Sequence, residues 1–487
     1  MLEKYDPPLV WKLFESISGI PRCSKHEQRI RSWIRRWAGK RALPSREDEA
    51  GNLLLQRAAA PGCEKFPTLV LQAHLDMVCL AQEKHRVDFD THPIRIRVDG
   101  KRVRAEGTTL GADNGIGVAY CLAALEDPEL VCGPLEVLLT VDEEEGAAGA
   151  LGLKPGFFSG RYLLNLDSEE EGIITIGTAG IETTDYTLAA SFEPVDGAAE
   201  IGLSIRGLPG GHSGVEIHLG RPNAIKLAVE ALAALGERLP VRLARFDGGE
   251  ATNSIPAAVE CLFSVPRERA DQARSVLRQW QSALLQSSCT WETQPEIEIS
   301  DGAARGAEAG AACTVELTRT LGGLLEQIPH GPLAYSRVIE HLVETSNNLA
   351  RIRTGEGGFE ISATCRSSVD ESLERLSGEL KRIGEANGAQ VRQHSRLCGW
   401  SADPASRFSE LVRMHYGAVL GRPVALKAIH AGLECGIFTG IAPGLQMASI
   451  GPDITAVHTP EESVDLASVA LLWKVLRRII TGMGELA

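Results

Sequence analysis

A histidine and several carboxylates follow short apolar runs in the first part of the chain. Three runs each lead directly into such residues: residues 67–73 into His74, 135–141 into the acidic run 142–145, and 162–166 into Asp167. Imidazole nitrogens and carboxylate oxygens are ligands for divalent cations. If these side chains converge, the chemistry open to them is metal-assisted hydrolysis, in which bound ions activate a water and polarise a carbonyl.

The elements that must position these residues are strands of an α/β domain. Short apolar runs separated by helix-length segments predict buried strands of a mostly parallel sheet, with helices on both faces. In such sheets ligands bind beyond the carboxyl ends of the strands. Asp113 lies just ahead of a helical pattern that begins at Gly115. We therefore expect one His and several carboxylates at one edge of one sheet.

Each cluster also suggests a role. The two oxygens of Asp113 could bridge two ions, which can hold a water between them. Glu143 and Glu144 are adjacent and point in different directions, so one can bind metal while the other acts as general base. Asp76 lies two residues beyond His74, on the same face of an extended chain, and could orient it. Donors of this kind suit Zn²⁺, Mn²⁺ or Co²⁺.

Each cluster, taken alone, can be explained by a structural role without metal binding. A histidine after a strand is often a buried residue with its hydrogen bonds satisfied, and an acidic run is often a solvated turn. The sequence Asp113-Asn114-Gly115 is typical of a turn. Their joint placement after strands is what favours the metal interpretation.

The pattern changes near residue 182. From there to about residue 398, alternating strands and amphipathic helices predict an α+β domain, and the buried type returns afterwards. We expect residues 1–182 and 399–487 to form one domain, interrupted by an inserted domain at 183–398.

Composition excludes several classes of protein. With 487 residues, 44% of them hydrophobic, the chain can bury a large core, and its net charge of −14 argues against a nucleic-acid partner. No apolar stretch reaches the length of a membrane span, and the first residues do not resemble a signal peptide. The 11 scattered cysteines, without a Cys-x-x-Cys pair, predict reduced thiols. We expect a soluble cytoplasmic protein.

The ordered motifs of the chain resemble those of M20 metallopeptidases, and most of all the aminoacyl-histidine dipeptidase branch. They are His74-Leu-Asp-Met-Val78, Gly107-Thr-Thr-Leu-Gly-Ala-Asp-Asn-Gly-Ile-Gly117, Glu143-Glu144, Asn165-Leu-Asp-Ser-Glu-Glu-Glu-Gly172, Gly210-Gly-His-Ser-Gly214, Ile429-His-Ala-Gly-Leu-Glu-Cys-Gly436, and Ser449-Ile-Gly-Pro452 with His458. Departures are small: Cys79 stands where relatives often have Pro, and Val215 where they have Gly.

The resemblance implies two divalent metal ions per chain, Zn²⁺ with Mn²⁺ or Co²⁺ as alternatives. It implies the following roles: His74 and Asp167 on one ion, Glu144 and His458 on the other, Asp113 as bridge, Asp76 orienting His74, and Glu143 as general base for the bridging water. The inserted domain would be a lid that mediates homodimerisation. By family motif His212 of the lid would stabilise the oxyanion, in many members from the partner subunit, and the substrate-binding positions would be Asn253, Arg366, His430 and Glu434.

The activity implied is a metal-dependent dipeptidase that cleaves unblocked dipeptides, Xaa-His among them. An M20 amidohydrolase or deacylase of other specificity is the first alternative. An inactive metal-binding homologue is the second, and the presence of every expected ligand and of Glu143 disfavours it.

Overall fold

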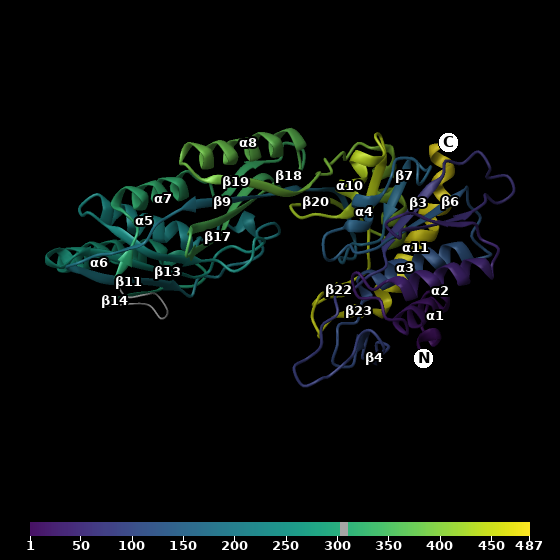
Figure 1. Cartoon of the computed structure of the whole chain (residues 1–487). Helices are drawn as coiled ribbons and strands as arrows, with labels where there is room; N and C mark the ends of the chain where they lie inside the picture. Colours follow the sequence, from purple (N-terminus) through teal and green to yellow (C-terminus); the bar gives the residue numbers. More distant parts are fainter. Residues whose placement is uncertain (302–309) are drawn as a thin grey trace. The chain divides into compact units, whose positions relative to one another are not determined.

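The computed structural model describes residues 1–301 and 310–487, which form two compact units (Figure 1). Unit 1 comprises Met1–Thr178, Trp400–Ala428 and Leu433–Ala487. Unit 2 comprises Ala179–Gly399 and the short segment Ile429–Gly432. The chain therefore leaves unit 1 after Thr178 and returns at Trp400, close to the predicted transitions after residues 182 and 398.

Unit 1 is built on an eight-stranded sheet in the order β1-β2-β6-β3-β7-β21-β8-β20. The central strands β6, β3, β7 and β21 are parallel, whereas β1 with β2, β2 with β6 and β21 with β8 are antiparallel. The predicted parallel arrangement thus describes the centre of a mixed sheet. The strands are β1 (Ser45–Glu47), β2 (Leu53–Arg57), β3 (Leu69–His74), β6 (Leu135–Thr140), β7 (Tyr162–Asn165), β8 (Ile173–Thr178), β20 (Ala425–Ile429) and β21 (Gln446–Ser449).

Helices cover both faces of this sheet, with α3 and α11 on one and α4 and α10 on the other (Figure 1). All six residues of β3 and of β6 are buried, including the polar Gln72 and Glu136, as expected of strands covered on two sides. None of the helices in the described ranges is long and apolar enough to cross a membrane. The helices of unit 1 are α1 (Pro8–Ser18), α2 (Gln28–Gly39), α3 (Ala112–Glu126), α4 (Ala148–Gly152), α9 (Arg407–Leu420), α10 (Glu434–Ile441) and α11 (Leu466–Gly482).

A small antiparallel sheet joins the two ends of unit 1. Its strands are β4 (Ile96–Asp99), β5 (Arg102–Ala105), β22 (Ile454–Thr455) and β23 (Ser463–Asp465), in the order β22-β23-β5-β4. The loop between β22 and β23 carries His458 and Glu462. Because β23 pairs with β5, this C-terminal loop is anchored to the N-terminal half of the unit.

In its described residues, unit 2 is an antiparallel sheet with helices packed against it around a large hydrophobic core. The helix α5 begins after Asn223, whose side chain accepts from the backbone N–H groups of Ile225 and Lys226. The sheet strands are β9 (Gly180–Ala189), β11 (Ala198–Arg206), β12 (Arg242–Gly248), β13 (Val259–Pro266), β14 (Glu296–Asp301), β16 (Gly331–Tyr335), β17 (Val343–Gly355), β18 (Gly358–Ser367) and β19 (Gln390–Leu397). The helices are α5 (Ala224–Gly236), α6 (Ala270–Ser287), α7 (Val315–Gln327) and α8 (Asp370–Ala386), and a separate ribbon pairs β10 (Glu193–Pro194) with β15 (Ala311–Ala312).

Two of the 11 cysteines, Cys23 and Cys79, form a disulfide in unit 1. The prediction that the cysteines are reduced thiols is therefore wrong for this pair, because the fold brings two distant segments together where sequence spacing gave no sign of pairing. Of the remaining cysteines, Cys289 and Cys398 are exposed and the others are buried free thiols.

Candidate metal centre

Parallel strands bring three of the predicted ligand segments to one edge of the unit 1 sheet. His74 is the last residue of β3, Glu144 follows β6, and Asp167 follows β7. In register, His74 lies beside Thr140 at the end of β6, and β7 pairs with the other side of β3. The carboxyl ends of these neighbours therefore meet, as expected for a ligand site in an α/β sheet.

Asp113 and His458 reach the same place from outside the sheet. Asp113 lies in the first turn of α3, and its backbone departs from helical geometry, with φ −78° and ψ 111°. His458 lies in the loop between β22 and β23 and is about half exposed. All five predicted ligands therefore belong to unit 1 and come together there.

The two carboxylate oxygens of Asp113 face two different groups of donors. Its Oδ1 lies 3.0 Å from His74 Nε2, which is also 3.2 Å from Asp167 Oδ1. Its Oδ2 lies 3.2 Å from His458 Nε2, which is also 2.9 Å from Glu144 Oε2. Asp113 is thus shared between a His74–Asp167 group and a His458–Glu144 group.

These donors fit divalent metal ions. In a tetrahedral site with bonds of about 2.0–2.1 Å, ligand atoms lie roughly 3.3 Å apart, close to the separations within each group. His74, Asp113 and Glu144 each present a ligand atom, and these atoms lie within 4.8 Å of one another. Hydrogen bonds to Asp113 and Glu144 raise the pKa of His458 to about 11. The concentration of negative charge that causes this shift would equally attract a cation, which competes with protons for such ligands.

Asp76 lies behind His74 and fixes its ring. Asp76 Oδ1 is 3.3 Å from His74 Nδ1, and the carboxylate also accepts from the backbone N–H groups of Glu143 and Glu144 and from the Ser24 hydroxyl. Burial opposes ionisation, but the hydrogen bond and the charge of His74, with the backbone donors, lower the pKa of Asp76 to about 2. The residue therefore remains a carboxylate, and it ties the His74 ring to the loop after β6.

Glu143, the predicted general base, precedes the ligand Glu144. Burial raises the pKa of its carboxyl well above the ordinary value, partly opposed by the charge of His74. The like charges of Asp167 and Glu144 act in the same direction as burial. A carboxyl with a raised pKa is a better proton acceptor than an exposed glutamate, which suits a general base.

Glu434, predicted to bind substrate, begins α10 and is fully buried below the strand ends. Its Oε2 accepts hydrogen bonds from Gln72 Nε2 at 2.6 Å and Thr140 Oγ1 at 2.7 Å. Burial raises the pKa of Glu434 to about 8. The structure thus places Glu434 in a polar layer that connects β3, β6 and α10.

The other residues predicted to contact substrate or the oxyanion lie in unit 2. His212 Nδ1 accepts from the backbone N–H groups of Gly214 and Val215, so the neutral ring carries its proton on Nε2. Burial and the nearby charge of Arg366 lower the pKa of His212, which keeps it neutral. Asn253 is exposed and adjoins His212, because its carbonyl accepts from Ser213 N–H.

Arg366 is the buried cation of this unit 2 group. It lies in β18 and is 5% exposed, and burial lowers its pKa to about 10. Its Nε has no hydrogen-bond partner among the described residues, which leaves a charged donor unsatisfied. His430 bonds Ser346 Oγ through Nε2, and burial together with the Arg366 charge lowers the pKa of His430 to about 3. The predicted domain boundaries include His430 in the domain of residues 1–182 and 399–487, whereas the structure assigns it to unit 2.

Three residues that support the site were not singled out in the sequence. Ser24 donates to Asp76, Arg22 donates to the carbonyls of Leu75 and Asp76, and Glu462 accepts from the backbone of Asp113. For Glu462 a signal existed, since it lies four residues after His458. Arg22 and Ser24 precede the motifs by some fifty residues, and nothing in their own sequence marks them.

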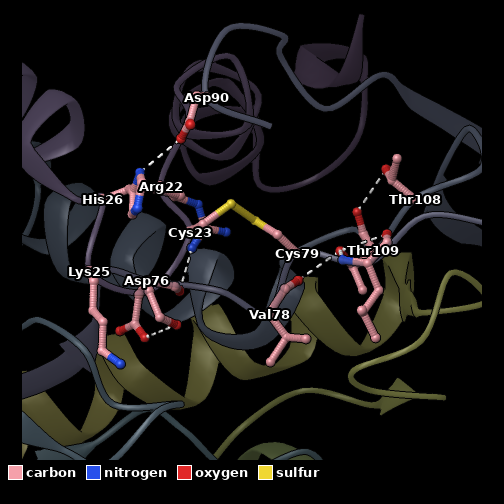
Figure 2. Close-up of a disulfide and its surroundings, with 12 residues drawn as sticks. Arg22, Cys23, Lys25, His26, Asp76, Val78, Cys79, Asp90, Thr108 and Thr109 are labelled. Carbon is pink, nitrogen blue, oxygen red and sulfur yellow. Dashed lines mark hydrogen bonds and ion pairs between the residues drawn. A yellow bond between two sulfur atoms is a disulfide. The ribbon is translucent and has the colours of Figure 1, made fainter. Parts of the chain in front are cut away.

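Figure 2 shows that the Cys23–Cys79 disulfide lies beside Arg22 and near Asp76. Cys23 stands between Arg22 and Ser24, and Cys79 follows Asp76 by three residues. A β-bridge between Cys23 and Met77 joins the same two segments. The disulfide therefore cross-links the segment that supports Asp76 to the segment that contains it.

The chain is similar to known peptidases over nearly its whole length. Peptidase family M20/M25/M40 matches residues 70–482. The cytosol non-specific dipeptidase of Escherichia coli (strain K12) is 37% identical over 480 residues, covering 98% of each chain. The crystal structure of aminoacylhistidine dipeptidase from Vibrio alginolyticus has a TM-score of 0.91 and 35% identity, covering 99% of this chain and 97% of that one. Aminopeptidase PepT from Bacillus cereus, at 16% identity and a TM-score of 0.57, shares the fold.

Proposed function

The chain belongs to peptidase family M20/M25/M40, and from this we propose that it is a metal-dependent dipeptidase. The proposed substrates are unblocked dipeptides, Xaa-His among them. Two relatives that match nearly the whole chain support this choice, because their names are those of a non-specific dipeptidase and an aminoacylhistidine dipeptidase. By the name of the first relative we also propose a cytoplasmic location.

The observation that carries the proposal is the division of the Asp113 carboxylate between two donor groups. A single metal site needs one such group, whereas here each oxygen of Asp113 faces its own histidine and its own second carboxylate. We infer two divalent ions, one with His74 and Asp167 and one with His458 and Glu144, with Zn²⁺ preferred and Mn²⁺ or Co²⁺ possible occupants. When bound, such a pair activates a water and polarises the scissile carbonyl.

Residues of unit 1 would handle the proton. Glu143 would accept a proton from the attacking water and deliver it to the leaving amine, which its raised pKa favours. Asp76 would hold the His74 ring with Nε2 toward the ligand group, because its own oxygen faces Nδ1. Asp76 also binds the backbone of Glu143, so one carboxylate positions both a ligand and the base.

Residues of unit 2 would recognise the substrate. The Nε2–H of neutral His212 is suited to stabilise the oxyanion by donating a hydrogen bond. Arg366, with its unsatisfied buried Nε, is suited to bind the substrate carboxylate together with Asn253. His430 and Glu434 are proposed to act near the substrate through the contacts described above. By family analogy we further propose that the protein is a homodimer formed through unit 2.

Hydrolysis of β-Ala-His and Gly-His by protein stripped of metal, with Zn²⁺, Mn²⁺ or Co²⁺ restored, tests the proposal. We expect metal-dependent cleavage of at least one dipeptide and little activity on N-acyl amino acids. A preference for N-acyl substrates would show that the activity is that of an amidohydrolase or deacylase, and not that of a dipeptidase. Absence of cleavage of either class by folded, metal-loaded protein would favour an inactive metal-binding homologue.

The general base has a matched control in the same acidic run. Glu143→Gln should lower kcat by roughly two to four orders of magnitude, the contribution usual for a general base, while two ions per chain remain bound. Glu145→Gln makes the same chemical change at an exposed residue paired with Lys25 and should leave kcat near wild type. Equal activity of the two variants would exclude Glu143 as the base.

A further inference from the structure

The segment that carries Asp113 lies between two buried side chains of opposite charge, Glu462 and Arg22. Each is 2% exposed, and neither has a role in the mechanism described above. A buried charge is costly unless hydrogen bonds or a partner charge compensate it. The hydrogen-bond partners of Glu462 and Arg22 therefore indicate which segments these two residues hold in place.

Glu462 accepts four consecutive backbone N–H groups at the start of α3. Oε2 lies 2.8 Å from Leu110 N and 2.9 Å from Gly111 N, and Oε1 lies 2.8 Å from Ala112 N and 3.2 Å from Asp113 N. Amides in the first turn of a helix lack intrahelical partners, and the helix dipole favours a negative charge there. The carboxylate thus fixes the backbone of Asp113 from one side.

Arg22 holds the same segment from the other side. Its guanidinium donates to the carbonyl of Gly111 and, through Nη1, to the carbonyls of Leu75 at 3.0 Å and Asp76 at 2.7 Å. A Cβ on Gly111 would lie 2.5 Å from Arg22 Nη2, and one on Gly115 would lie 2.7 Å from it. The two glycines therefore leave the space that the guanidinium fills. Figure 2 shows Arg22 beside Cys23 and close to Asp76.

We propose that Glu462 and Arg22 are positioning residues that clamp the start of α3 and thereby set Asp113 between His74 and His458. Arg22 connects this segment to the end of β3, which carries His74. Glu462 connects it to the loop that carries His458. The inference rests on the proposed metal site and adds to it the two side chains that hold three separate ligand segments in register.

The substitution Glu462→Gln tests the positioning role of this carboxylate. A glutamine keeps the size of the side chain, but its NH₂ group donates where the carboxylate accepts. Two of the four backbone N–H groups would then face a donor, and the Asp113 backbone would shift. Glu461→Gln is the matched control, because Glu461 is the exposed neighbour of Glu462 and undergoes the same chemical change.

The measurement is the Zn²⁺ affinity of metal-stripped protein, determined by competition with a chromophoric chelator. We expect Glu462→Gln to bind Zn²⁺ roughly ten- to a hundredfold more weakly, the loss usual when a group that orients metal ligands is removed. The Glu461→Gln variant should bind as wild type does. At limiting Zn²⁺ the kcat for dipeptide should fall in Glu462→Gln while KM changes little, and excess Zn²⁺ should restore part of the kcat.

A purely structural role for Glu462 would lower the melting temperature of the metal-free protein and leave the Zn²⁺ affinity of the folded protein unchanged. That result would overturn the proposal. If Glu462→Gln does not fold, Glu462→Asp and Arg22→Lys serve instead, since both keep the charge, while the first shortens the side chain and the second removes the guanidinium fork. Wild-type Zn²⁺ affinity in both of these variants would also overturn the proposal. A wild type that binds no Zn²⁺ would refute the metal site itself, and the clamp with it.

Discussion

Cleavage of the Cys23–Cys79 disulfide should destabilise unit 1 by about 4 kcal/mol. The two cysteines are 56 residues apart in the sequence. Closing a loop of that length removes about 14 cal/mol/K of chain entropy from the unfolded state, which corresponds to about 4 kcal/mol at 25 °C. The Cys23–Met77 bridge and the bond from Ser24 to Asp76 do not involve the sulfur atoms, so we expect the folded protein to remain active.

Urea unfolding of oxidised wild type, wild type with a dithiol reductant, and Cys79→Ser measures this loss. The reduced wild type and the variant should unfold at the same lower urea concentration, and the reductant should not shift the variant further. Cys398→Ser removes an exposed free thiol and should unfold as wild type does under oxidising conditions.

Thiol titration of the denatured, unreduced protein decides whether the reasoning applies. We expect nine reactive thiols among the 11 cysteines. Eleven would show that the disulfide does not form. Nine thiols together with equal stability of wild type and Cys79→Ser would refute the chain-entropy argument.

Three further substitutions test the site. Asp76→Asn removes the charge that orients His74 and should weaken metal binding roughly ten- to a hundredfold in chelator competition; unchanged affinity would refute its orienting role. Arg366→Lys replaces a guanidinium fork by a point charge and should raise KM for dipeptides by roughly tenfold or more, as expected for a charged hydrogen bond of ~1.5–3 kcal/mol; an unaltered KM would exclude carboxylate binding by Arg366. His212→Asn should lower kcat by roughly two to three orders of magnitude with metal content unchanged, and a kcat near wild type would exclude an oxyanion role.

The strands that end at the site could be predicted because their residues carry a local signal. Both β3 and β6 are mostly apolar runs, each interrupted by one polar residue and followed at once by polar residues, and such runs identify strands buried on two faces. Helix α2 also carries a local signal, because Ile30, Ile34 and Trp37 recur at helical spacing and all three are buried. The direction of the outer strands was not predictable, since the apolar run of β2 is the same whether it pairs parallel or antiparallel.

The supports of the site depend on contacts between residues far apart in sequence. Glu462 meets the start of α3 across about 350 residues, and Arg22 meets Gly111 across 89. A lone buried arginine or glutamate has no periodicity and no turn chemistry that would mark it. The disulfide was missed for the same reason, because the spacing of Cys23 and Cys79 matches no recognised pair motif.

Because Glu462 occupies the N-terminus of α3, this helix end is not available to bind a substrate carboxylate. A helix N-terminus is a ready site for a ligand carboxylate, since its free amides and its dipole favour negative charge. Here Glu462 already occupies the amides of residues 110–113 and is itself buried. Under the proposed function these amides are therefore not free to bind a dipeptide carboxylate, whereas Arg366 is suited to this because it is buried and its Nε has no hydrogen-bond partner among the described residues. On this reasoning, Arg366→Lys should affect KM, whereas Glu462→Gln should affect Zn²⁺ affinity, and an exchange of these two effects would contradict it.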